Sequence, residues 1–177
     1  MVIKKKLCLL YISLILGFLF PGGVAMGDGL PEYRLKAAFI FNFIAYTQWP
    51  NDLGSEVNLC IIGKHGFGDE IDSLNGRQVN QRSIALAQKK YSDDLQECEV
   101  IYVANDTMQY LPEILKSVEN KHTLTIADTE NAIERGIMLN MLLDDNRVIF
   151  EANQKVARDA GLLLNAKLLR LAAKVHQ

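Results

Sequence analysis

The chain has 177 residues, with 19 Lys and Arg against 21 Asp and Glu, which gives a formal net charge of −2 at pH 7. This length is enough for one domain with a substantial core. Because nucleic-acid binding depends on clustered basic side chains that contact phosphates, the acidic balance gives no electrostatic basis for a nucleic-acid partner.

The first 27 residues have the layout of a secretory signal peptide. Three lysines at positions 4–6 precede an apolar stretch at 7–20, and the small residues Ala25 and Gly27 follow at the spacing of a cleavage site. The apolar stretch is shorter than the ~20 residues that span a bilayer, and an uncleaved membrane anchor is the alternative. We expect cleavage after Gly27 to leave one periplasmic domain, residues 28–177, with 16 basic and 21 acidic residues and a net charge of −5.

Residues 31–48 are predicted to form a helix. Pro31 and Glu32 suit its first turn, and Trp49-Pro50 follows its end. Its apolar residues cover more than one face, with one stripe running from Leu35 to Tyr46. A helix this apolar is expected to be buried on most sides, the alternative being a surface that binds a partner.

Strands and helices alternate through the middle of the chain. Short apolar runs rich in β-branched residues predict strands, and the segments between them predict helices. The expected strands are 57–62, 83–87, 99–104 and 122–127, and the expected helices are 67–73 and 108–119, the latter capped by Thr107. This order predicts parallel pairing with helices on both faces of the sheet.

The last third begins with two apolar runs, 137–143 and 147–152, which flank a loop of Asp and Asn and predict a hairpin. Helices are expected at 154–160 and 165–175, divided at Gly161. The predicted fold class is therefore α/β, a single-domain layered fold with a mixed sheet of about six strands flanked by about five helices.

The glycine-rich stretch at 63–68 raises the question of a phosphate-binding loop. Its spacing is G-x-x-G-x-G, whereas a dinucleotide-binding turn requires G-x-G-x-x-G, and no Gly-Lys-Ser/Thr sequence closes a P-loop. The histidines have no metal-ligand spacing, and a pair of His65 with Asp69 is weak evidence for a hydrolase. We therefore expect a binding or regulatory protein without enzymatic activity, cofactor or metal.

Two cysteines, Cys60 and Cys98, follow the apolar leader. An even number of cysteines in an oxidising compartment predicts one disulfide, and two buried free thiols in apolar strands are the alternative.

A series of short motifs runs in one order along residues 32–173. They are Lys36-Ala37-Ala38-Phe39, Asn42-Phe43, Trp49-Pro50, Gly76-Arg77, CEVIYVA at 98–104, LTIAD at 124–128, RVIFEAN at 147–153 and ARDAGLLLNAKLLRLA at 157–172. In these motifs together the chain resembles the YfiR family of small periplasmic regulators.

The resemblance implies a sheet flanked by helices, often in a homodimer, and a regulatory function. It implies that the protein binds the periplasmic sensor domain of an inner-membrane diguanylate cyclase and represses it, which lowers cyclic di-GMP and biofilm formation. In some systems of this family an OmpA-like outer-membrane lipoprotein sequesters the repressor. The family also implies a disulfide between Cys60 and Cys98, whereas a second pair near the late hairpin is absent, because residues 137–149 hold no cysteine.

The candidate partner surface combines the RVIFEAN strand with the last predicted helix. It includes Arg147, Glu151 and Asn153 on the strand and Lys167 and Arg170 on the helix. The basic side chains would steer an acidic partner, the alternative being a solvated basic face. Glu151 and Asn153 are also candidates for capping the helix that follows the strand.

A small-ligand binding protein is the alternative function. A glycine turn at the carboxyl end of a strand can border a crevice where the strand order of an α/β sheet reverses.

Overall fold

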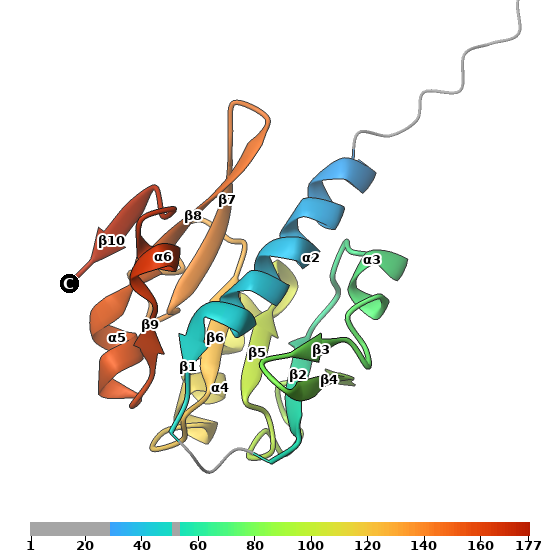
Figure 1. Ribbon diagram of the computed structural model, residues 1–177, viewed down its shortest axis with the longest axis vertical. Coiled ribbons are helices and arrows are strands. Elements are labelled where there is room, and N and C mark those ends of the chain that lie inside the picture. The colour runs from blue at the N-terminus through green and yellow to red at the C-terminus, as the bar shows by residue number, and fades with distance from the viewer. Residues whose placement is uncertain (1–28, 51–53) are drawn as a thin grey trace, which may run out of the picture.

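A computed structural model describes residues 29–50 and 54–177. The predicted signal peptide lies outside the described residues. The described chain is built around a mixed sheet with helices on both faces (Figure 1). The α/β class is confirmed, although the sheet has eight strands where about six were expected.

The eight strands lie in the order β10-β8-β7-β6-β5-β2-β4-β3. Their bounds are β2 (Glu56–Ile62), β3 (Gln78–Val79), β4 (Arg82–Lys89), β5 (Val100–Val103), β6 (Leu124–Ala127), β7 (Leu139–Asp144), β8 (Arg147–Asn153) and β10 (Lys174–His176). A separate antiparallel pair joins β1 (Thr47–Gln48) to β9 (Leu163–Leu164).

The centre of the sheet is parallel. Strands β4, β2, β5, β6 and β7 pair in parallel, and β7 and β8 form the predicted antiparallel hairpin. Every residue of β5 and β6 is buried, and apart from Thr125 of β6 these strands contain no small polar or charged residue. The chain passes from β2 to β4 on one side and then to β5 on the other, so the strand order reverses between β2 and β5.

Helix α2 (Gly29–Tyr46) lies across one face of the sheet (Figure 1). Its buried positions include Ile40 and Phe43, and the Phe43 ring packs edge-on against Phe150 of β8 at 5.0 Å. The stripe predicted to be buried is instead partly exposed, because Leu35 and Tyr46 retain 44% and 36% of their accessible surface. Among the described residues, no helix has the length and apolarity to span a membrane.

The opposite face is covered by a 3-10 turn, η1 (Asn105–Tyr110), and helix α4 (Leu111–Ser117). The helix predicted at 108–119 is present but begins later, at Leu111, and Thr107 does not cap it. The Thr107 hydroxyl donates to the carbonyl oxygens of Ile62 and Ala104, at 3.1 and 2.9 Å, and so ties the turn to the end of β2. Pro112 lies in the first turn of α4, where its missing N–H leaves no bond unmade.

Two short helices, α3 (Asp69–Asp72) and α5 (Gln154–Asp159), lie near their predicted positions. The prediction of a long last helix is wrong: α6 (Ala166–Leu169) is a single turn. The chain then leaves the helix, exposes 70% of Leu171, and forms β10 beside β8. This pairing satisfies backbone groups of β8 that would otherwise lie at an open sheet edge.

Candidate functional site

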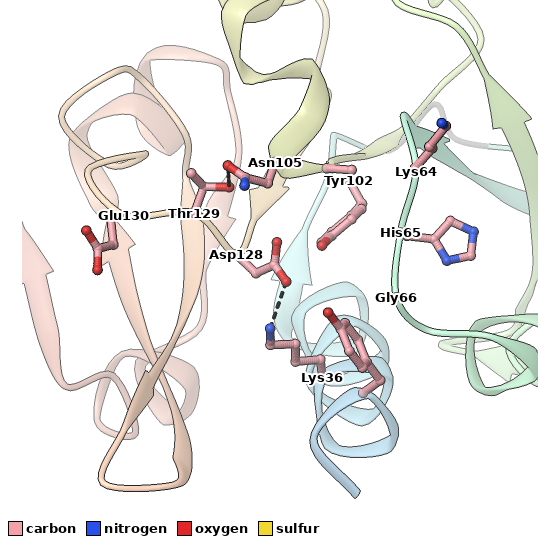
Figure 2. Close-up of a pocket in the computed structure, with 11 residues that line it drawn as sticks. Lys36, Lys64, His65, Gly66, Tyr102, Asn105, Asp128, Thr129 and Glu130 are labelled. Atoms are coloured by element: carbon pink, nitrogen blue, oxygen red, sulfur yellow. Dashed lines mark hydrogen bonds and ion pairs between the residues drawn. The ribbon is translucent and has the colours of Figure 1, made fainter. Parts of the chain in front are cut away.

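A crevice lies at the carboxyl ends of β2, β5 and β6, beside the point where the strand order reverses. Crevices at this position of an α/β sheet are where ligands generally bind. Its volume is about 490 Å³. The lining residues are Tyr33, Lys36, Lys64, His65, Gly66, Tyr102, Ala104, Asn105, Asp128, Thr129 and Glu130 (Figure 2).

A buried ion-pair cluster forms one wall of the crevice. The Lys36 ammonium, on a residue that is 5% exposed, lies 2.7 Å from the Asp128 carboxylate and 2.6 Å from the Glu32 carboxylate. Burial lowers the pKa of Lys36, but hydrogen bonds and the charges of Asp128 and Glu32 outweigh it and raise the pKa above the ordinary 10.5. Lys36 is therefore fully charged at physiological pH.

Two tyrosines border this cluster. Tyr102 is almost completely buried near the end of β5, and its side chain extends toward Lys36 and Asp128 (Figure 2). Burial raises the pKa of Tyr102, and the nearby Asp128 carboxylate raises it further, so the hydroxyl stays protonated. Tyr33 lies on α2 with its ring centroid 5.0 Å from the Lys36 nitrogen, which is cation–π distance.

The glycines at 63–68 allow close packing of this loop. A Cβ at Gly63 would collide with the Asp106 carboxylate, which accepts a hydrogen bond from the Lys64 backbone N–H at 3.0 Å. A Cβ at Gly66 would collide with the Tyr33 ring. One N–H that a phosphate would require is thus already bonded, which agrees with the conclusion that this stretch is not a phosphate cradle.

His65 faces away from the charged cluster (Figure 2). Its ring packs against Phe67 at 5.6 Å, and its Nδ1 is buried without a hydrogen-bond partner among the described residues. This orientation gives no support to the hydrolase alternative, which would require His65 to be aligned with a carboxylate.

The predicted partner residues lie near one edge of the sheet, formed by β8, β10 and α6 (Figure 1). Lys167 and Arg170 are exposed on and beside α6. Glu151 is half-buried in β8, with an oxygen 3.7 Å from His176 Nε2. Arg147 opens β8 and lies four residues from Glu151, about 13 Å along the strand.

Asn153 has a structural role in this region. Its side chain accepts a hydrogen bond from the Val156 N–H at 3.1 Å and so caps α5, as one of the two interpretations of the sequence predicted. Glu151 does not cap that helix.

The Cys60–Cys98 disulfide implied by the resemblance is present. Strand β2 lies beside β5, which brings the two Cα atoms to 5.8 Å. Both cysteines are 2% exposed and lie on the α4 side of the sheet, away from the crevice.

A family model described as YfiR/HmsC-like matches residues 33–173. The chain belongs to the YfiR/HmsC-like family. Membership agrees with the regulatory role and the periplasmic location that the resemblance implies. The buried disulfide fits an oxidising compartment of this kind.

Two solved structures share the fold of this YfiR/HmsC-like chain. One is a conserved domain protein from Vibrio cholerae O1 biovar El Tor strain N16961, with a TM-score of 0.53 and 10% identity. The other is an ABC domain from Streptococcus pneumoniae in complex with L-Trp, with a TM-score of 0.55 and 9% identity. Each alignment covers 81% of this chain and 60% of the other, so the chain spans about 60% of the length of those structures.

Sequence reasoning missed the charged cluster, although two of its members lie in motifs that carry the family resemblance. Lys36 opens the KAAF motif, and Asp128 closes the LTIAD motif. Two features of the sequence could have indicated the cluster. Lys36 lies on an apolar helix, four residues after Glu32, and Asp128 directly follows a buried strand.

Proposed function

We propose that this protein binds the periplasmic sensor domain of an inner-membrane diguanylate cyclase and represses it, which lowers cyclic di-GMP and biofilm formation. The observation that carries the proposal is the YfiR/HmsC-like match, which extends over nearly all of the described residues. Such a regulator acts through contacts between proteins and does not need catalytic groups of its own.

The edge formed by β8, β10 and α6 is the proposed contact surface. Lys167 and Arg170 are exposed there, and Leu171, which is 70% exposed, lies next to Arg170. An exposed apolar side chain next to a cation suits a partner surface that combines acidic and apolar groups.

The test measures binding of the purified sensor domain to the full mature chain, with Lys167→Glu/Arg170→Glu as the variant. We expect the variant to bind at least about tenfold more weakly and to raise cellular cyclic di-GMP. The matched control is Lys116→Glu, which reverses one exposed charge on α4, on the other face of the sheet. Equal loss of binding in both variants would contradict the contact surface, and an unchanged cyclic di-GMP level after deletion of the gene would contradict repression.

The proposal includes a homodimer and sequestration by an OmpA-like lipoprotein, both of which rest on the resemblance. Sedimentation equilibrium of the mature chain tests the first, and competition between the lipoprotein and the sensor domain tests the second. A monomer at micromolar concentration would contradict the homodimer. Binding of the lipoprotein and the sensor domain without competition would contradict sequestration.

A second candidate function is the binding of a small ligand. The crevice beside Lys36 favours it, because it lies where ligands generally bind in such sheets. One structure with the same fold was solved in complex with L-Trp. Native mass spectrometry of protein purified without denaturation tests this function, since a bound small molecule would add a discrete mass.

A further inference from the structure

We propose that the crevice beside Lys36 binds its ligand through a positively charged amino group that contacts Asp128. The inference rests on the small-ligand function and names the chemical class that the site accepts. It does not depend on the identity of the protein partner.

A buried ion pair between two elements of the fold forms the wall of the crevice. Lys36 and Asp128 come from elements far apart in sequence, and their side chains are 7% and 10% exposed. Removing charges from water is costly, and an apolar cluster of the same volume is often at least as stable as a buried ion pair. Stability alone is therefore a weak explanation for this cluster, which borders an open crevice at the carboxyl ends of the strands.

The balance of charge in the cluster selects for a cation. Two carboxylates, Glu32 and Asp128, flank the single ammonium of Lys36. Coulomb energy falls as the inverse of distance, so an anion placed against Lys36 is attracted by one charge and repelled by two that lie only slightly farther away. A cation placed against Asp128 has its nearest neighbour attractive and only Lys36 repulsive, at a greater distance.

The remaining charged groups of the crevice do not alter this balance. Lys64 and Glu130 carry opposite charges, and both side chains point away from the cluster (Figure 2). Asp128 also has spare acceptor capacity, because a carboxylate offers about four acceptor positions and the Lys36 nitrogen and the Tyr102 hydroxyl each occupy one.

The aromatic walls favour the same class of ligand. The Tyr33 ring, which also lines the crevice, has its centroid 5.0 Å from the Lys36 ammonium, so its π system adds negative potential to the same wall. The Tyr102 hydroxyl, which lies beside Asp128 in the crevice, can accept a hydrogen bond from an amine.

The test uses a matched series of four-carbon probes: butylamine, 1-butanol and butyrate. Each is titrated into the full mature chain while backbone amide shifts are followed by NMR. We expect butylamine to bind most tightly and to shift the amides of Ala127, Asp128 and Asn105, with butyrate the weakest. Equal or tighter binding of 1-butanol or butyrate in the crevice would leave ligand binding standing and overturn the amine class. Absence of shifts in the crevice with all three probes would overturn the inference.

Variants test the contact itself. Asp128→Asn should weaken butylamine binding at least about tenfold, the loss expected for a hydrogen bond to a charged group. Glu134→Gln, which removes an exposed carboxylate elsewhere, should leave it unchanged. If Asp128→Asn does not fold, Glu32→Gln supplies the measurement, because it removes the second carboxylate that flanks Lys36. This variant should weaken the binding of butylamine and strengthen the binding of butyrate. Unaltered binding in the folded variant would overturn the proposed contact.

Discussion

Removal of the Cys60–Cys98 bridge is expected to lower the free energy of unfolding by about 4 kcal/mol. The bridge joins residues separated by 38 positions. In the chain-entropy model, closing a loop of that size removes about 13 cal/mol/K from the unfolded ensemble, which is about 4 kcal/mol at 25 °C. Both side chains are 2% exposed, so the replacement of choice is Cys60→Ala/Cys98→Ala, which buries neither a free thiol nor an unpaired hydroxyl.

Urea unfolding followed by circular dichroism measures this loss. For a domain of ~150 residues, about 4 kcal/mol corresponds to a fall in melting temperature of roughly 8–16 °C. Wild-type protein unfolded in the presence of a reductant is the matched control and should show nearly the same loss, whereas the double variant should not respond to the reductant. A loss below about 1 kcal/mol, or two reactive thiols in the native wild-type protein, would refute the reasoning.

Three further changes test the cap, the cluster and the glycine loop by urea unfolding. Asn153→Ala should cost about 1 kcal/mol through loss of the cap on α5, and an unchanged midpoint would contradict that role. Burial lowers the pKa of Lys36, but its two carboxylate partners raise this pKa above 10.5. The charged Lys36 therefore stabilises the fold below pH 10.5, and this stabilisation is lost as the pH rises further. The variant Lys36→Met should flatten the decline in stability from pH 10 to 12. Gly66→Ala should cost about 1–3 kcal/mol by forcing the Tyr33 ring aside, while Gly54→Ala, where a Cβ meets nothing within 4 Å, should cost little.

The elements that could be predicted from the sequence are those whose local pattern and tertiary environment agree. Strands β5 and β6 are buried on both sides, so their short runs of apolar and β-branched residues identify them. The late hairpin could be predicted from the Asp and Asn residues between its two apolar runs. In the structure Asp145 and Asn146 have φ of 44° and 59°, values that Asp and Asn tolerate and that a two-residue turn requires.

The C-terminal segment was mispredicted because its local pattern fits two structures. Leu168, Leu171 and Ala172 recur at helical spacing, yet a helix continued through Val175 would leave the outer edge of β8 unpaired. Backbone pairing along that edge outweighs the exposure of Leu171. A short window of the sequence does not reveal this pairing, because residues 154–173 lie between β8 and β10.

The glycine loop shows how a tertiary contact gives meaning to a local motif. Its spacing excludes a phosphate cradle, but the sequence alone does not say what requires Gly63 and Gly66. In the fold, each glycine makes room for a side chain from another element, Asp106 from η1 and Tyr33 from α2. The loop thereby brings α2 against the carboxyl ends of the strands, where Lys36 reaches Asp128. The glycines therefore help to form the crevice because they have no side chain at these two close contacts. A substitution at Gly66 should disturb both Tyr33 and the amine-binding wall.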